Sequence, residues 1–185
     1  MIRSQTGGYV FVGGGAFGGT IVTVDATFDS STGSFANPSP FAVASGLAYM
    51  GSSLMGAAHN GGGSPAGLVN VNTVTGQLTP VGSFSMPGPL SGLEYNATAN
   101  TFYVVSGGGN PSTLYHLDPA TGAVTNSMAV SPATVLGRLR YANGTLYAGG
   151  QDGNLWTLDP NTGALTLVET ISGFGMISGM AIKQN

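Results

Sequence analysis

The chain has 185 residues, of which 32 are glycine and only 6% are charged, and its net charge is −3. Typical domains contain about 7% glycine and about 25% charged residues. Four cations are too few for the basic patch that a nucleic-acid partner requires. Too few charged residues are present to solvate the outer face of a long amphipathic helix. The mean hydropathy of +0.22 argues against simple disorder, and no apolar run approaches the roughly 20 residues of a membrane helix.

The N-terminal residues carry no apolar core of a secretory signal after Arg3. Cysteine is absent, so the chain has no disulfide framework, thiolate metal site or cysteine nucleophile. A nearly uncharged exterior suits a durable outer surface. We therefore expect an extracellular or cell-surface location, with a chain that is already mature or that is exported by another route.

Two motifs recur along the chain in constant phase. The first ends in Thr-Gly and is clearest as Leu114-Tyr-His-Leu-Asp-Pro-Ala-Thr-Gly122 and Leu155-Trp-Thr-Leu-Asp-Pro-Asn-Thr-Gly163. Its glycines are residues 33, 76, 122 and 163, at spacings of 43, 46 and 41. The second motif, Ser-Gly-Leu-x-Tyr and its variants, begins at residues 45, 91, 137 and 178. The motifs predict a single domain, residues 1–185, with repeats at 1–44, 45–90, 91–136 and 137–177.

Each repeat is expected to form four short strands, because short runs rich in Val, Leu, Tyr and Thr alternate with Gly, Asn and Pro clusters. In the third repeat these strands are Gly92–Tyr95, Thr101–Ser106, Thr113–Leu117 and Val124–Ala129. The Asp-Pro-x-Thr-Gly segment predicts a tight turn, in which Asp accepts backbone N–H groups and Gly adopts a left-handed conformation. Asn143-Gly144 predicts a two-residue hairpin. The Gly-rich segments at 13–15, 61–63, 107–109 and 149–150 are expected to be hairpins.

Repeats of about 40–45 residues with four strands predict an all-β fold, a β-propeller of four blades, each a four-stranded antiparallel sheet. The first repeat has strands expected near Tyr9–Val12, Ile21–Phe28 and Phe35–Phe41, but none before them. The missing strand is predicted at the other end of the chain. It would complete the first blade of the same chain, help two chains build an eight-bladed ring, or complete a neighbour's blade in a polymer. The residues assigned to closure and assembly are Ser178, Gly179, Met180, Ala181 and Ile182.

The pattern Leu-Tyr/Trp-x-Leu-Asp-Pro-x-Thr-Gly, preceded by Gly-x-Leu-Tyr-x-Gly-Gly, resembles blades of quinoprotein-like and related bacterial surface β-propellers. The resemblance covers nearly the whole chain and is close over residues 91–177. Quinoprotein enzymes place a Trp shortly after Thr-Gly, where this chain has Val124-Thr-Asn and Leu165-Thr-Leu. Their charged cofactor ligands have no counterpart here, so we expect no cofactor.

Few residues are candidates for chemistry. Asp29, Asp118 and Asp159 share one turn position, and His116 is interpreted as a packing residue within a strand. Glu94 and Arg140 occupy equivalent repeat positions, which predicts an ion pair between repeats; the alternative is a polar channel site for an anion or a substrate. The candidate ligand or channel residues are His59, Asn60, Asn110, Glu94, Arg138 and Arg140.

No catalytic constellation and no metal-ligand spacing is recognisable. The favoured hypothesis is therefore a non-catalytic structural protein of an extracellular or surface assembly, which associates with itself through propeller faces or strand exchange, even into filaments. The alternatives are a carbohydrate- or surface-binding propeller module, a virion surface or decoration protein, and an enzyme with a site around Glu94, Arg138 and Arg140. The expected partner is the chain itself or a carbohydrate, with no nucleic acid and no membrane span.

Overall fold

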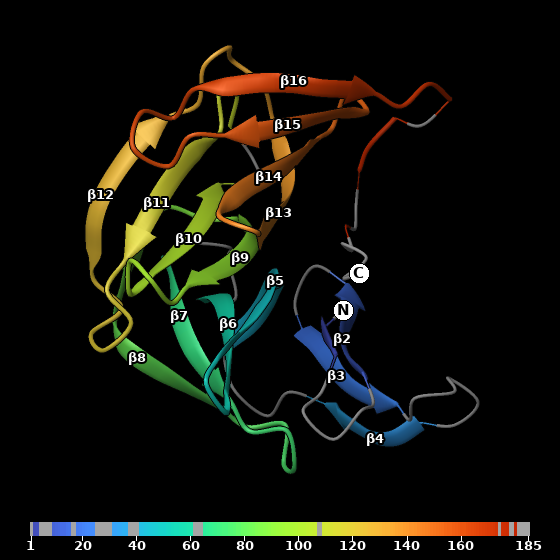
Figure 1. The fold of residues 1–185 in the computed structure, drawn as a ribbon. Helices are drawn as coiled ribbons and strands as arrows, with labels where there is room; N and C mark the ends of the chain where they lie inside the picture. Colours follow the sequence, from blue (N-terminus) through green and yellow to red (C-terminus); the bar gives the residue numbers. More distant parts are fainter. Residues whose placement is uncertain are drawn as a thin grey trace.

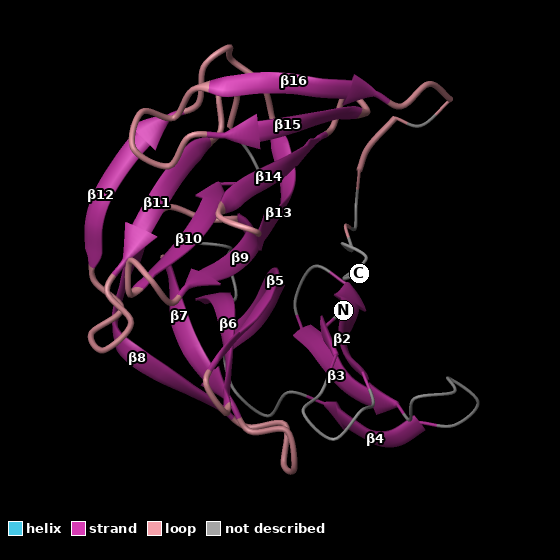
Figure 2. Ribbon diagram, viewed as in Figure 1, coloured by secondary structure: helices cyan, strands magenta, loops and turns pink. Residues whose placement is uncertain are grey.

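The computed structural model describes residues 2–3, 9–15, 18–24, 31–36, 41–60, 65–106, 109–173, 175–177 and 180, with side chains from Gly46 onward apart from Asn60 and Phe84. These residues form strands and turns (Figure 2). No helix long and apolar enough to cross a membrane occurs in the described part of the chain.

The described strands form four antiparallel four-stranded sheets, in each of which the strands pair in chain order (Figure 1). The first sheet contains β1 (Ile2–Arg3), β2 (Tyr9–Gly15), β3 (Gly18–Val24) and β4 (Ser31–Ala36). The second contains β5 (Phe41–Met50), β6 (Ser53–Asn60), β7 (Ala66–Val71) and β8 (Leu78–Met86). The third contains β9 (Leu90–Asn96), β10 (Thr101–Ser106), β11 (Thr113–Leu117) and β12 (Val124–Ala129). The fourth contains β13 (Leu136–Ala142), β14 (Thr145–Gly150), β15 (Asn154–Leu158) and β16 (Leu165–Thr170).

The predicted turns form as the sequence indicates. Gly76, Gly122 and Gly163 have φ values of +72°, +67° and +73°, and each donates its N–H to the carbonyl of the residue four positions earlier. Asn143 and Gly144 have φ values of +51° and +78° and connect Ala142 to its partner Thr145. This is the two-residue hairpin with positive φ at both central positions. In the third repeat, the last three strands match the predicted bounds.

The first repeat differs from the prediction in three ways. A strand does precede Tyr9, because Ile2 pairs with Val10 and Arg3 with Tyr9; two residue pairs are too few to produce a recognisable pattern. The third strand is Gly18–Val24 rather than 21–28, and the fourth is Ser31–Ala36, so its Thr-Gly pair lies within a strand. Glycines 13–15 belong to β2, although glycine lowers strand propensity. They lead into the predicted hairpin, because β2 pairs antiparallel with β3 up to the pair Gly15 and Gly18. The Gly149–Gly150 pair likewise ends β14.

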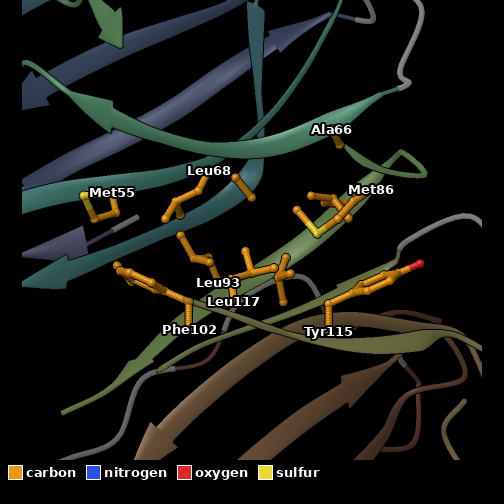
Figure 3. Close-up of a cluster of buried hydrophobic side chains, with 12 residues drawn as sticks. Met55, Ala66, Leu68, Met86, Leu93, Phe102, Tyr115 and Leu117 are labelled. Atoms are coloured by element: carbon orange, nitrogen blue, oxygen red, sulfur yellow. The ribbon is translucent and has the colours of Figure 1, made fainter. Parts of the chain in front are cut away.

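The third sheet packs face to face with the second and with the fourth. Between the second and third sheets lies a cluster that includes Met55 and Leu68 from one sheet and Leu93, Phe102 and Leu117 from the other (Figure 3). All five are at most 1% exposed. Burial of such side chains contributes about 1.5–3 kcal/mol each, so this cluster stabilises the contact between repeats. A second cluster, including Tyr103, Leu114, Leu139 and Trp156, joins the third sheet to the fourth.

The first strands of the second, third and fourth sheets, β5, β9 and β13, lie side by side on the inner side of an arc (Figure 1). The first sheet contacts β5 through β3. The described residues do not close the arc into a ring, since the first and fourth sheets face its open side (Figure 1). The predicted closing segment, residues 178–182, lies outside the described residues except for Met180, which is half-buried and is not in a strand.

Candidate functional site

The predicted pairing of Glu94 and Arg140 is present. Nη1 of Arg140 lies 3.4 Å from Oε1 of Glu94 and donates a hydrogen bond to it. The carboxylate is on β9 and the guanidinium on β13, so the pair joins the inner strands of two adjacent sheets. The Glu94 side chain is 13% exposed and the Arg140 side chain 37% exposed. Nε of Arg140 is buried and has no hydrogen-bond partner among the described residues.

Burial dominates the electrostatics of this pair. It raises the pKa of Glu94 to about 7, because desolvation outweighs the charge of Arg140 and the hydrogen bonds from Tyr141 and Arg140. Burial also lowers the pKa of Arg138, whose Nη1 donates to the Gly137 carbonyl at 3.1 Å. The contact between β9 and β13 is thus one guanidinium and one carboxyl group that takes up a proton near neutral pH.

His116 makes the packing contact that the sequence predicted. Its Nε2 lies 2.7 Å from the carbonyl oxygen of Pro160, which belongs to the turn before β16 in the next sheet. Its ring also meets Tyr103 edge-on, with centroids 5.0 Å apart. Because a carbonyl only accepts, Nε2 carries the proton in this contact. His116 therefore connects two repeats.

The turn aspartates act as hydrogen-bond acceptors. Oδ1 of Asp118 accepts from the N–H groups of Ala120 and Thr121 and from the Thr121 hydroxyl, at 2.8–3.0 Å. Asp159 accepts from the Asn161 N–H and the Thr162 hydroxyl. These bonds lower the pKa of both carboxyl groups. In the second repeat, the amide oxygen of Asn72 takes the same role toward Val74 and Thr75. Asp29 lies outside the described residues.

The other candidate residues, His59, Asn60 and Asn110, lie in or beside the loops of the second and third sheets, and none of the structure's described contacts joins them to Glu94 or Arg140. His59 is half-buried near the end of β6 and has a contact of its own. The backbone of Asn60 ends the same strand, whereas residues 61–64 lie outside the described part. Asn110 is exposed between β10 and β11.

One buried polar residue was missed by the sequence analysis. Ser112 is 0% exposed, and its hydroxyl donates to the Ser106 carbonyl and accepts from the Leu136 N–H, at 2.8 and 2.9 Å. Its backbone also bonds Thr134 and Val130. Ser112 thereby fastens the start of β13 to the third sheet. A lone serine after proline carries no signal for such a role.

The described residues contain no group of three or more His, Cys, Asp or Glu side chains that could hold a metal ion. The Glu94–Arg140 pair offers a guanidinium that can bind an anionic group and a carboxyl group that can exchange a proton.

A family model matches residues 59–179 of the chain, and its description is "Repeat of unknown function (DUF6923)". The match covers more than half of the sequence, so the chain belongs to this repeat family. No match to the sequence was found among curated proteins.

Solved structures resemble the fold at low sequence identity. The glutaminyl cyclase of Myxococcus xanthus superposes with a TM-score of 0.63 at 17% identity, over 89% of this chain and 71% of that one. A luciferin-regenerating enzyme superposes with a TM-score of 0.59 at 14% identity, over 92% of this chain and 60% of that one. The Dos1 propeller gives 0.52 at 10% identity, over 80% and 41% of the two chains. These similarities show the fold alone, a propeller-like arrangement of four-stranded sheets, and two of the three structures are considerably longer than this chain.

Proposed function

We propose that this chain is a non-catalytic structural protein of an extracellular or surface assembly, which associates with itself. The observation that carries the proposal is the distribution of exposed large apolar side chains. Among the described residues, Leu167, Val168, Ile171 and Met176 are 38–51% exposed and follow one another in and after β16. They lie within ten residues of one another along the outer edge strand of the fourth sheet and the segment after it, and exposed apolar side chains gathered on one segment suit an interaction site.

The charged residues support the same proposal. Asp118 and Asp159 are used in turns, Glu94 and Arg140 in a contact between sheets, and His116 in another. With 6% charged residues, the exterior also lacks the repulsion that keeps proteins apart. A sparsely charged surface of this composition suits a durable extracellular layer.

The assembly unit proposed here has four blades, with residues 178–182 as the inner strand of the first blade of the same or a neighbouring chain. The path of the chain after β16 supports this, because the Ile177 N–H donates to the Gly150 carbonyl at 3.1 Å and so returns to the fourth sheet's inner side. β1 holds the corresponding place beside β2 by two residue pairs only. In the proposed assembly, residues 178–182 would take the place of this short β1 beside β2.

The test is the size of the particles that the purified protein forms. Light scattering and negative-stain electron microscopy should show oligomers of the full chain, and deletion of residues 178–185 should reduce them to monomers. Deletion of residues 183–185 alone is the matched control and should leave the oligomers in place. Oligomers that persist unchanged in the longer deletion would refute the role of the closing segment, and a monomeric full chain would refute self-association.

A further inference from the structure

Two Asn-x-Ser/Thr triplets without a central proline occur in the chain, Asn96-Ala-Thr98 and Asn143-Gly-Thr145. This triplet is the acceptor sequence for N-linked glycans in secreted proteins. Each lies at the turn between the first and second strands of its sheet, β9 and β10 in one repeat and β13 and β14 in the next. The structure distinguishes the two triplets, because their asparagine side chains have opposite environments.

The side chain of Asn96 is held inside the fold. Asn96 is 7% exposed, and its Oδ1 accepts the N–H groups of Thr98 and Ala99 at 3.0 and 3.1 Å. Its Nδ2 donates to the hydroxyl of Tyr103 at 3.3 Å, and Tyr103 packs in the cluster between the third and fourth sheets. A glycan is bulky and needs a surface position. A glycan on Nδ2 would displace the contact with Tyr103, so the folded chain has no room for one at Asn96.

Asn143 lies exposed at the tip of a two-residue hairpin, and its side chain makes no hydrogen bond with the described residues. The positive φ values of Asn143 and Gly144 turn the chain back on itself, so that Ala142 pairs with Thr145. A Cβ atom at Gly144 would meet no atom within 4 Å outside its chain neighbours, so the tip projects into open space. The amide nitrogen of Asn143 can therefore accept a large group without the loss of any contact made by the described residues.

We propose that Asn143 is an N-glycosylation site and that Asn96 is not. The inference rests on the extracellular location in the proposed function, because such glycans belong to secreted chains. In the transfer, Nδ2 of Asn143 forms a bond to the anomeric carbon of a sugar, while the bond from that carbon to the phosphate oxygen of a lipid-pyrophosphate donor breaks. The amide loses one proton and the leaving pyrophosphate takes one up, so the atoms balance.

A glycan at this tip is compatible with the proposed self-association. In the fourth sheet the strands pair in chain order and antiparallel, so the β13–β14 and β15–β16 turns lie at one end of the sheet. The exposed apolar residues Ile171 and Met176 follow β16 at the opposite end. The glycan would therefore keep one end of the fourth sheet in water and leave the other end available to a second copy.

The test is secretion of the full chain, behind a removable signal sequence, from a eukaryotic host that attaches N-linked glycans. Digestion with peptide N-glycosidase F and peptide mass spectrometry then locate each glycan. We expect a glycan at Asn143 in the wild type and its complete loss in Asn143→Asp. Aspartate tolerates the positive φ of this turn, so the variant should keep the fold. Thr145→Ser retains the acceptor triplet and should retain the glycan.

Thr98→Ala is the matched control. Thr98 is exposed, and the group that bonds Asn96 is its backbone N–H, which alanine retains. The variant thus removes the other triplet, leaves the buried asparagine in place, and should keep the glycan. A secreted, folded wild type without a glycan at Asn143, or with a glycan that disappears in Thr98→Ala, would overturn the site.

The same preparations separate this inference from the proposed function. If the secreted chain carries no glycan but forms oligomers, the site is refuted and the proposed self-association stands. If it carries the glycan at Asn143 and is monomeric in light scattering before and after enzymatic removal of the glycan, the site is supported and self-association is refuted.

Discussion

Arg140 and Glu94 occupy equivalent positions in successive repeats and meet at 3.4 Å between Nη1 and Oε1. One repeat position thus carries opposite charges on adjacent inner strands. If the same residue stood there in every repeat, the neighbouring charges would be alike or absent. The Glu94 side chain, only 13% exposed, loses much hydration, and the attraction of Arg140 does not automatically compensate for that loss. The raised pKa of Glu94 expresses this balance.

The first prediction concerns pH. The pKa of Glu94 is raised from 4.5 to about 7, so between these values the folded state holds a proton that the unfolded state has released. The free energy of unfolding contributed by this group is fully present below pH 4.5 and is lost as pH rises through 7, by a total of about 3 kcal/mol. Urea unfolding at pH 5 and pH 8 should show most of this difference, about 2.5 kcal/mol, in the wild type and lose it in Glu94→Gln. Glu169→Gln, on the exposed strand β16, is the control and should retain it.

The second prediction concerns the tight inner junction. Gly92→Ala combines a positive φ of +63° with a Cβ atom 2.6 Å from the Leu139 nitrogen, so it should destabilise the fold by at least about 2 kcal/mol. Gly144→Ala shares the positive φ but has no atom within 4 Å of the added carbon. The control should cost about 1 kcal/mol. Equal losses of unfolding free energy in the two variants would mean that the close approach is absent in solution.

The third prediction concerns the Asp turns. Asp118→Asn keeps an oxygen acceptor, as Asn72 does in the second repeat, and should change the melting temperature little. Asp118→Ala removes the three bonds that Oδ1 accepts and should lower the melting temperature by about 2–4 °C. Calorimetry distinguishes the variants. A decrease as large for Asn as for Ala would indicate that charge, rather than hydrogen bonding, holds the turn.

The fourth prediction concerns the contact of His116 with Pro160. His116→Ala removes the 2.7 Å hydrogen bond and the edge contact with Tyr103, and should cost about 1–3 kcal/mol of unfolding free energy. His116→Gln retains an N–H donor and should recover part of the loss. If urea unfolding gives the same midpoint for both variants, packing alone explains the contribution of His116.

Local features of this protein follow from its sequence because they depend on neighbouring residues. The spacing of Thr-Gly and Ser-Gly-Leu sets the four-strand repeat, and Asp118 with Gly122 determines a turn through bonds made within five residues. Even the contact between Glu94 and Arg140 follows from the spacing of the repeats, since equivalent positions on adjacent inner strands lie close together. The first repeat was predicted less well. Its glycines and the short β1 are held in the sheet by backbone hydrogen bonds, and such bonds leave no pattern of apolar and polar residues in the sequence.

The tertiary structure decided what depends on distances between sheets. Only packing shows that Gly46 and Gly92 are required by the close approach of the next inner strand. Burial, which the order of residues does not reveal, moves the pKa of Glu94 toward neutrality and leaves Leu167 and Val168 exposed. The sparse charge of the chain is thus read from the sequence, whereas the arrangement of its sheets determines which of the few charged side chains meet.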